Sequence, residues 1–182
     1  LLFLGWLFPG TEWMNAGPSV DQAATMFRIL LPFVGMPKWE KFLSRIQRHP
    51  FPEFQLWNGS TLEFRGAGKE YIEQIRSREY DGVNVDEAGL FSSYAIQVFE
   101  GRILGSKAGR KRMGLFSLTT SKRAAARWLY ERAKRGMIDN PNRVKDRLTI
   151  EMTTRENIHL DMVRLESISE NMTDNLRKQE LE

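Results

Sequence analysis

Residues 80 to 91 read YDGVNVDEAGLF, an apolar, β-branched run that ends on the adjacent acids Asp86 and Glu87. Acids at the end of a buried strand either cap the next helix or form a site for a metal ion and a water. Because successive side chains of a strand point to opposite faces, the two acids can serve different purposes. Asp86 is a candidate Mg²⁺ ligand, and Glu87 a candidate for orienting or deprotonating the water that attacks a phosphoryl group. The alternative is that Asp86 caps the following helix and Glu87 is solvated.

The composition is that of an ordinary soluble, globular chain. Its 182 residues suffice for one domain with a sizeable core, and 41% are hydrophobic against 27% charged. The absence of cysteine excludes disulfides, thiolate metal sites and a cysteine nucleophile, and it suits a reducing compartment. A net charge of +4 is compatible with attraction to a polyanion, and an ordinary basic surface is the equal alternative.

The first residues, LLFLGWLF, form an apolar run that is too short to cross a bilayer and lacks the features of a signal peptide. The chain begins inside this run and without a start methionine. We therefore expect a buried helix whose beginning lies upstream of Leu1, and no membrane segment.

Strands and helices alternate along the chain, which indicates an α/β fold with a mostly parallel sheet flanked by helices. Asn58-Gly59 predicts a β-hairpin turn between two alternating apolar and polar arms. Ser19 predicts the N-cap of the second helix. The expected strands, with the hairpin arms included, are residues 12–17, 54–57, 60–65, 82–86, 113–119 and 147–153. The expected helices are residues 1–8, 19–34, 39–47, 69–77, 92–104, 122–135 and 157–182.

Two further features carry possible chemistry. One apolar strand ends on Thr119, Thr120 and Ser121, directly before a basic amphipathic helix. Small hydroxyls beside an acidic metal site can sense a γ-phosphate or hold a water, and Ser121 is also a good N-cap; the two interpretations do not exclude each other. Arg76 precedes Asp86 by ten residues and is a candidate for stabilising charge on a transferring phosphate, with an ordinary surface charge as the alternative.

Taken in order, these segments resemble the ATPase domain of the large terminase subunit, the DNA-packaging motor of tailed bacteriophages. The matching segments are NAGPSVDQA, NGSTLEFRG, IRSREYDGVNVDEA and LFSLTTSKRAAARWLYE, while TTRENIHLD and RKQELE resemble the lead into the family's nuclease domain. The resemblance implies a RecA-like P-loop NTPase fold of the additional-strand, catalytic-glutamate type. It also implies one ATPase domain over residues 1–182, with a helical tail at 157–182 and the nuclease domain absent.

The resemblance assigns a role to each candidate residue. Asp86 is implied as the Mg²⁺ residue of a Walker B motif, and Glu87 as the catalytic glutamate. Arg76 is implied as an arginine finger that acts on a neighbour's ATP, and Thr119 to Ser121 as the coupling motif. The implied function is ATP hydrolysis that moves double-stranded DNA into a procapsid in the host cytoplasm. The implied partners are DNA, the portal, the small terminase subunit and a ring of identical subunits.

The sequence departs from that family in one respect, because it contains no phosphate loop. The segment FRGAGKE follows a strand, but Gly68-Lys69 is followed by Glu70, and the position of the first glycine is Glu63. In the family the phosphate loop and its strand would lie upstream of Leu1. We therefore expect these 182 residues alone to be inactive, with unpaired backbone groups where the central strand of the sheet is missing.

The rival interpretation is a non-catalytic DNA-binding or assembly module of RecA-like fold that has lost its phosphate loop. A related helicase-type ATPase is a third possibility. DNA contact is expected of the basic loop GSKAGRKRMG, for which a solvated loop is the equal alternative. Its candidate residues are Lys107, Arg110, Lys111 and Arg112.

Overall fold

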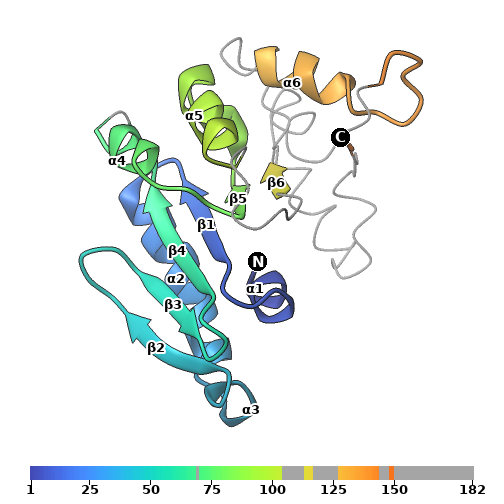
Figure 1. The fold of residues 1–182 in the computed structure, drawn as a ribbon. Helices are drawn as coiled ribbons and strands as arrows, with labels where there is room; N and C mark the ends of the chain where they lie inside the picture. The colour runs from blue at the N-terminus through green and yellow to red at the C-terminus, as the bar shows by residue number, and fades with distance from the viewer. Residues whose placement is uncertain (69, 104–112, 117–126, 144–147, 150–182) are drawn as a thin grey trace, which may run out of the picture. The chain divides into compact units, whose positions relative to one another are not determined.

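The computed structural model describes residues 1–68, 70–103, 113–116, 127–143 and 148–149 (Figure 1). The chain forms two compact units, Leu1–Leu118 and Thr119–Glu182. The first unit holds the described strands and all described helices except one, α6 (Arg127–Lys134), which lies in the second. The expectation of a single ATPase domain stays a prediction.

Within the described residues, six strands form one sheet in the order β2-β3-β4-β1-β5-β6. Neighbours among β4, β1, β5 and β6 run parallel, whereas β3 is antiparallel to both β2 and β4. Pairing continues from β2 to β6 without a gap, so the expected break in the middle of the sheet is not present among these strands. The strands are β1 (Glu12–Gly17), β2 (Leu43–Gln47), β3 (Glu53–Leu56), β4 (Thr61–Gly66), β5 (Gly82–Val85) and β6 (Met113–Phe116).

The predicted hairpin is confirmed as β3 and β4. Its turn is a tight loop in which Gly59 donates its N–H to the Leu56 carbonyl at 3.0 Å. Gly59 has φ +81°, a left-handed conformation that glycine adopts without a steric penalty. Asn58 instead uses its side-chain amide to donate to the carbonyls of Gly5 and Trp6 at 2.9 and 3.1 Å, which ties the hairpin to the first helix.

The first unit contains five α-helices and one 3₁₀ helix among its described residues. The predicted cap of α2 is confirmed, since the Ser19 hydroxyl accepts the N–H of Gln22 at 3.2 Å. The first helix is also confirmed, but it is not buried: Phe3 is 62% exposed, and Gly5 is its buried residue. The helices are α1 (Leu2–Leu7), α2 (Val20–Val34), α3 (Pro37–Glu40), α4 (Ile72–Arg76), η1 (Ala88–Leu90) and α5 (Ser93–Ile103).

The expected helix at residues 39–47 is wrong over most of its length. The helix α3 ends at Glu40, and Leu43–Gln47 form the edge strand β2. Ile46 pairs there with Phe54 of β3. Backbone pairing with an available strand outweighs a weak local helix preference, because strand formation depends strongly on tertiary context.

A cluster of aromatic rings joins α2 to β3 and β4. The Phe27 ring of α2 stacks on Phe54 at 4.7 Å between centroids, and Phe64 meets Phe54 edge-on at 5.5 Å. All three side chains are buried. This cluster fixes α2 against one face of the sheet, and so positions its N-terminus relative to the ends of the strands (Figure 1).

The second unit is described over α6 and the turn that follows it. Leu129 is the buried residue of α6, and Gly136 donates to the Ala133 carbonyl at 2.8 Å where the helix ends, as predicted. Residues 122–126 of the predicted helix, nearly all of the strand predicted at 147–153 and the tail at 157–182 lie outside the described residues. None of the helices in the described ranges has the length and apolar character that a membrane crossing requires.

Candidate functional site

The two acids of the predicted site lie at the carboxyl end of β5, between the neighbouring strands β1 and β6. The N–H of Asp86 donates to the Ala16 carbonyl at 3.2 Å, which extends the parallel ladder to the first acid. The carboxylate Oδ1 of Asp86 accepts the N–H of Glu87 at 3.1 Å. The cap of α5 is Ser92, whose hydroxyl accepts the N–H of Ala95 at 3.2 Å. The interpretation of Asp86 as the cap of the next α-helix is therefore wrong.

Glu87 has an unusual backbone conformation. Its φ of 49° and ψ of 48° place it in the left-handed region, and among the described residues it is the only non-glycine with positive φ. A side chain in this region costs about 1 kcal/mol or more, and such residues concentrate at functional sites. This turn carries the chain from β5 into η1.

Gln22, in the first turn of α2, contacts Glu87 from the other side of the site. Its amide Nε2 donates to Oε2 of Glu87 at 3.2 Å, and its Oε1 accepts from the Ser19 hydroxyl at 3.2 Å. The sequence analysis missed this role. The available signal was the spacing of Ser19 and Gln22, which is that of a capping box. In such a box the glutamine returns to the cap backbone, whereas here it bridges the cap hydroxyl and the acid.

Two glycines allow the ends of β1 and β4 to approach α2 closely. Gly17 and Gly66 are partners in the parallel register. A Cβ on Gly66 would lie 2.4 Å from the backbone nitrogen of Val20, and one on Gly17 would lie 2.8 Å from that of Ala23. Packing therefore accounts for the first glycine of FRGAGKE without a phosphate.

Arg76 ends α4 and is not brought to the two acids within this chain. Its Nη1 lies 3.1 Å from Oε2 of Glu73 and 3.5 Å from the hydroxyl of Tyr94, on α5. The hydrogen bond from Tyr94, followed by that from Arg76, lowers the pKa of Glu73. The hydrogen bond with Glu73 is the main reason why the pKa of Tyr94 is raised.

A buried ionic cluster, which the sequence analysis also missed, holds the segment between Arg76 and β5. Glu63 of β4 accepts hydrogen bonds from Arg65 Nε at 2.9 Å, from the Tyr80 hydroxyl at 3.1 Å and from Arg78. Burial, and then the charge of Glu63, raises the pKa of Tyr80. The cluster anchors the chain directly before the strand that carries the acids.

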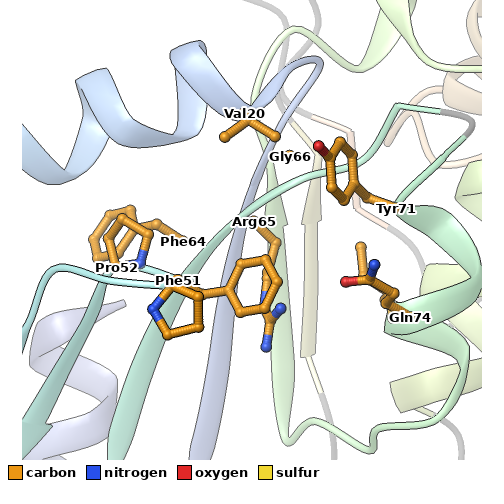
Figure 2. Close-up of a pocket in the computed structure, with 10 residues that line it drawn as sticks. Val20, Phe51, Pro52, Phe64, Arg65, Gly66, Tyr71 and Gln74 are labelled. Atoms are coloured by element: carbon orange, nitrogen blue, oxygen red, sulfur yellow. The ribbon is translucent and has the colours of Figure 1, made fainter.

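Arg65 also borders a small pocket. Its guanidinium carbon lies 3.6 Å from the centroid of the Phe51 ring, an arrangement typical of a cation–π contact. Figure 2 shows Arg65 between Phe51 and the side chains of Tyr71 and Gln74. The two acids do not line this pocket.

The other predicted site residues cannot be placed. Thr119, Thr120, Ser121, Lys107, Arg110, Lys111 and Arg112 lie outside the described residues. In the part of the chain that is described, no group of three or more His, Cys, Asp or Glu side chains is arranged to hold a metal ion. The described acids of the site are thus the pair at the end of β5.

Comparison with solved structures identifies the architecture. No protein-family model matches the sequence, and no curated protein sequence is significantly similar to it. The large terminase ATPase domain of Thermus phage P74-26 superposes with a TM-score of 0.69 at 18% identity, covering 99% of this chain and 78% of that one. The chain has the fold of a phage large-terminase ATPase domain.

Two further large terminases show the same terminase fold. That of bacteriophage HK97 gives a TM-score of 0.62 at 16% identity, over 99% of this chain and 42% of its own. That of a thermophilic bacteriophage, solved in complex with ADP, gives 0.57 at 16% identity, over 96% and 41%. This chain therefore spans about two fifths of each. The predicted RecA-like terminase fold is confirmed, while the roles of individual residues stay predictions.

Proposed function

We propose that this chain is the core of the ATPase motor domain of a phage large terminase, which hydrolyses ATP to move double-stranded DNA into a procapsid. The observation that carries the proposal is the position of Asp86 and Glu87 at the end of a parallel strand of a terminase ATPase fold. The left-handed backbone of Glu87 adds support, because strain of this kind is retained where function requires it. The large terminase of the thermophilic bacteriophage, which shares the fold, has been solved with ADP.

The acids fit the proposed magnesium ion. Mg²⁺ in nucleotide sites is usually held by one or two carboxylates, with waters and phosphate oxygens completing its coordination. The pair of acids, without a larger described cluster, fits such an open site better than a cage made of protein ligands alone. Asp86 would hold the ion, which supplies neutralisation of phosphate charge when bound.

Glu87 would orient the attacking water and accept its proton. The hydrogen bond from Gln22 limits where the carboxylate can point, and the bond between the Glu87 N–H and Asp86 ties the orientation of one acid to the other. Fixing a catalytic group in advance reduces the entropy lost when the reacting atoms are brought together.

Arg76 would stabilise phosphate charge on the ATP of a neighbouring subunit in a ring. Its exposure, 58% for the side chain, and its partners on α4 and α5 support action outside its own subunit. In the same proposal Thr119, Thr120 and Ser121 couple hydrolysis to movement. DNA phosphates are contacted by Lys107, Arg110, Lys111 and Arg112. The portal and the small terminase subunit are the proposed assembly partners, in the host cytoplasm.

The decisive experiment is Glu87→Gln in the protein expressed from its complete reading frame, since these 182 residues contain no phosphate-loop pattern. We expect ATP binding to be retained and turnover to fall at least about 100-fold, because the amide cannot accept the proton. Near-normal turnover would contradict the assignment of Glu87.

A second candidate, the non-catalytic binding module, is favoured by that missing pattern. Titration of the wild-type protein with a fluorescent ATP analogue distinguishes the two candidates. Binding supports the motor, whereas DNA binding without nucleotide binding supports the module.

A further inference from the structure

Arg76 is held on the protein surface by groups from two helices. Its Nη1 donates to Glu73 Oε2 at 3.1 Å and lies 3.5 Å from the Tyr94 hydroxyl. That hydroxyl donates to the other oxygen of Glu73, Oε1, at 2.6 Å. The three side chains thus form a closed triangle of polar contacts between α4 and α5.

The backbone of Arg76 is fixed as well. Its carbonyl accepts a hydrogen bond from Nη1 of Arg102, near the end of α5, at 2.7 Å. An exposed arginine ordinarily samples many rotamers, and an isolated surface ion pair restrains it little. Contacts from a second helix to both its backbone and its side chain distinguish Arg76 from an ordinary surface charge.

The triangle leaves much of the guanidinium available. A guanidinium carries five N–H donors, and the contacts of Arg76 with described side chains involve Nη1 alone. Nε and Nη2 therefore keep donors that can bind a phosphate oxygen. Because Glu73 also accepts from Tyr94, its charge is shared between two donors, and it competes less strongly with a phosphate for Arg76.

We propose that Tyr94 and Glu73 are positioning residues that hold Arg76 ready for a nucleotide phosphate presented by another subunit. The inference rests on the proposed function, in which Arg76 acts on a neighbour's ATP. Tyr94 fixes Glu73, and Glu73 fixes the guanidinium, so less rotamer freedom is lost when the phosphate is engaged. Neither residue touches the reacting atoms.

The test is Tyr94→Phe in the protein expressed from its complete reading frame, assayed for steady-state hydrolysis of MgATP under conditions in which it oligomerises. We expect kcat to fall about threefold to tenfold with KM unchanged, because the contact matters in the transition state. Glu73→Gln, which keeps the shape but removes the charge, should act in the same direction. Tyr130→Phe is the matched control, since Tyr130 is 49% exposed against 45% for Tyr94 and lies on α6.

A double-mutant cycle separates positioning from a general structural effect. If Tyr94 acts through Arg76, Tyr94→Phe should lower kcat no further in an Arg76→Ala background. An equal loss in both backgrounds, an unchanged kcat or an increased kcat in the single variant would overturn the inference.

The Arg76→Ala variant tests the premise separately. A loss in Arg76→Ala with no effect of Tyr94→Phe overturns the positioning role and leaves the proposed function standing. An unchanged kcat in Arg76→Ala overturns the arginine-finger assignment, and the inference with it.

Discussion

The side-chain amide of Gln22 donates to the carboxylate of Glu87 across 3.2 Å, linking the first turn of α2 to the residue that follows Asp86. The two residues are 65 positions apart in the chain. Their contact depends on the close approach of α2 to the strand ends, which Gly17 and Gly66 permit. The orientation of the proposed catalytic glutamate is therefore determined partly by helix packing.

Removing this contact should lower catalysis without preventing folding. For Gln22→Ala we expect kcat to fall about threefold to tenfold, the cost of losing one orienting hydrogen bond. Gln22→Glu should lose more, because a second negative charge at that distance repels Glu87. Steady-state ATP hydrolysis measures both, with Gln97→Ala, at an exposed position on α5, as control. Equal rates in Gln22→Ala and wild type would show that Gln22 does not orient the glutamate.

Asp86→Asn should weaken the use of Mg²⁺ more than the binding of nucleotide. An amide is a poorer ligand than a carboxylate for a hard cation, so we expect at least about a tenfold rise in the Mg²⁺ concentration that gives half-maximal hydrolysis. Titration of activity with Mg²⁺ at saturating ATP measures this. Asp139→Asn, at an exposed position, should behave as wild type. An unchanged Mg²⁺ requirement in Asp86→Asn would argue that the ion is held elsewhere.

The two glycines of FRGAGKE should respond differently to alanine. A Cβ on Gly66 would meet the Val20 backbone at 2.4 Å, whereas one on Gly68 would meet nothing within 4 Å. We expect Gly66→Ala to destabilise the fold by about 1–3 kcal/mol, since backbone must move, and Gly68→Ala to change stability by less than about 0.5 kcal/mol. Urea unfolding compares them. If Gly68→Ala abolished nucleotide binding while Gly66→Ala had no effect, this segment would have to be reconsidered as a phosphate loop.

Glu63 should be essential for stability because its charge is buried and shared by several donors. Replacing it by alanine leaves Arg65, 6% exposed, without its carboxylate partner. Loss of one member of a buried pair costs about 3–5 kcal/mol. Denaturant unfolding of Glu63→Ala should show this, with the exposed Glu40→Ala near wild type. A loss below about 1 kcal/mol would show that water replaces the carboxylate.

Features encoded within a few neighbouring residues were predictable from the sequence. They include the strand β5 with its two acids, the Ser19 cap of α2 and the hairpin around Gly59. Each depends on local steric or hydrogen-bonding preferences that neighbouring residues express wherever they are placed. The ordered set of such segments was sufficient to indicate the terminase fold.

Tertiary structure decided what depends on partners distant in the sequence. Residues 43–47 became a strand because β3 offered a pairing edge, and Asp86 lost its expected role as a cap because Ser92 lies in the capping position. The contact of Gln22 with Glu87 and the donors around Glu63 join residues on separate elements. No local preference specifies such pairs, because their energy is gained only after packing has brought the elements together and excluded water between them.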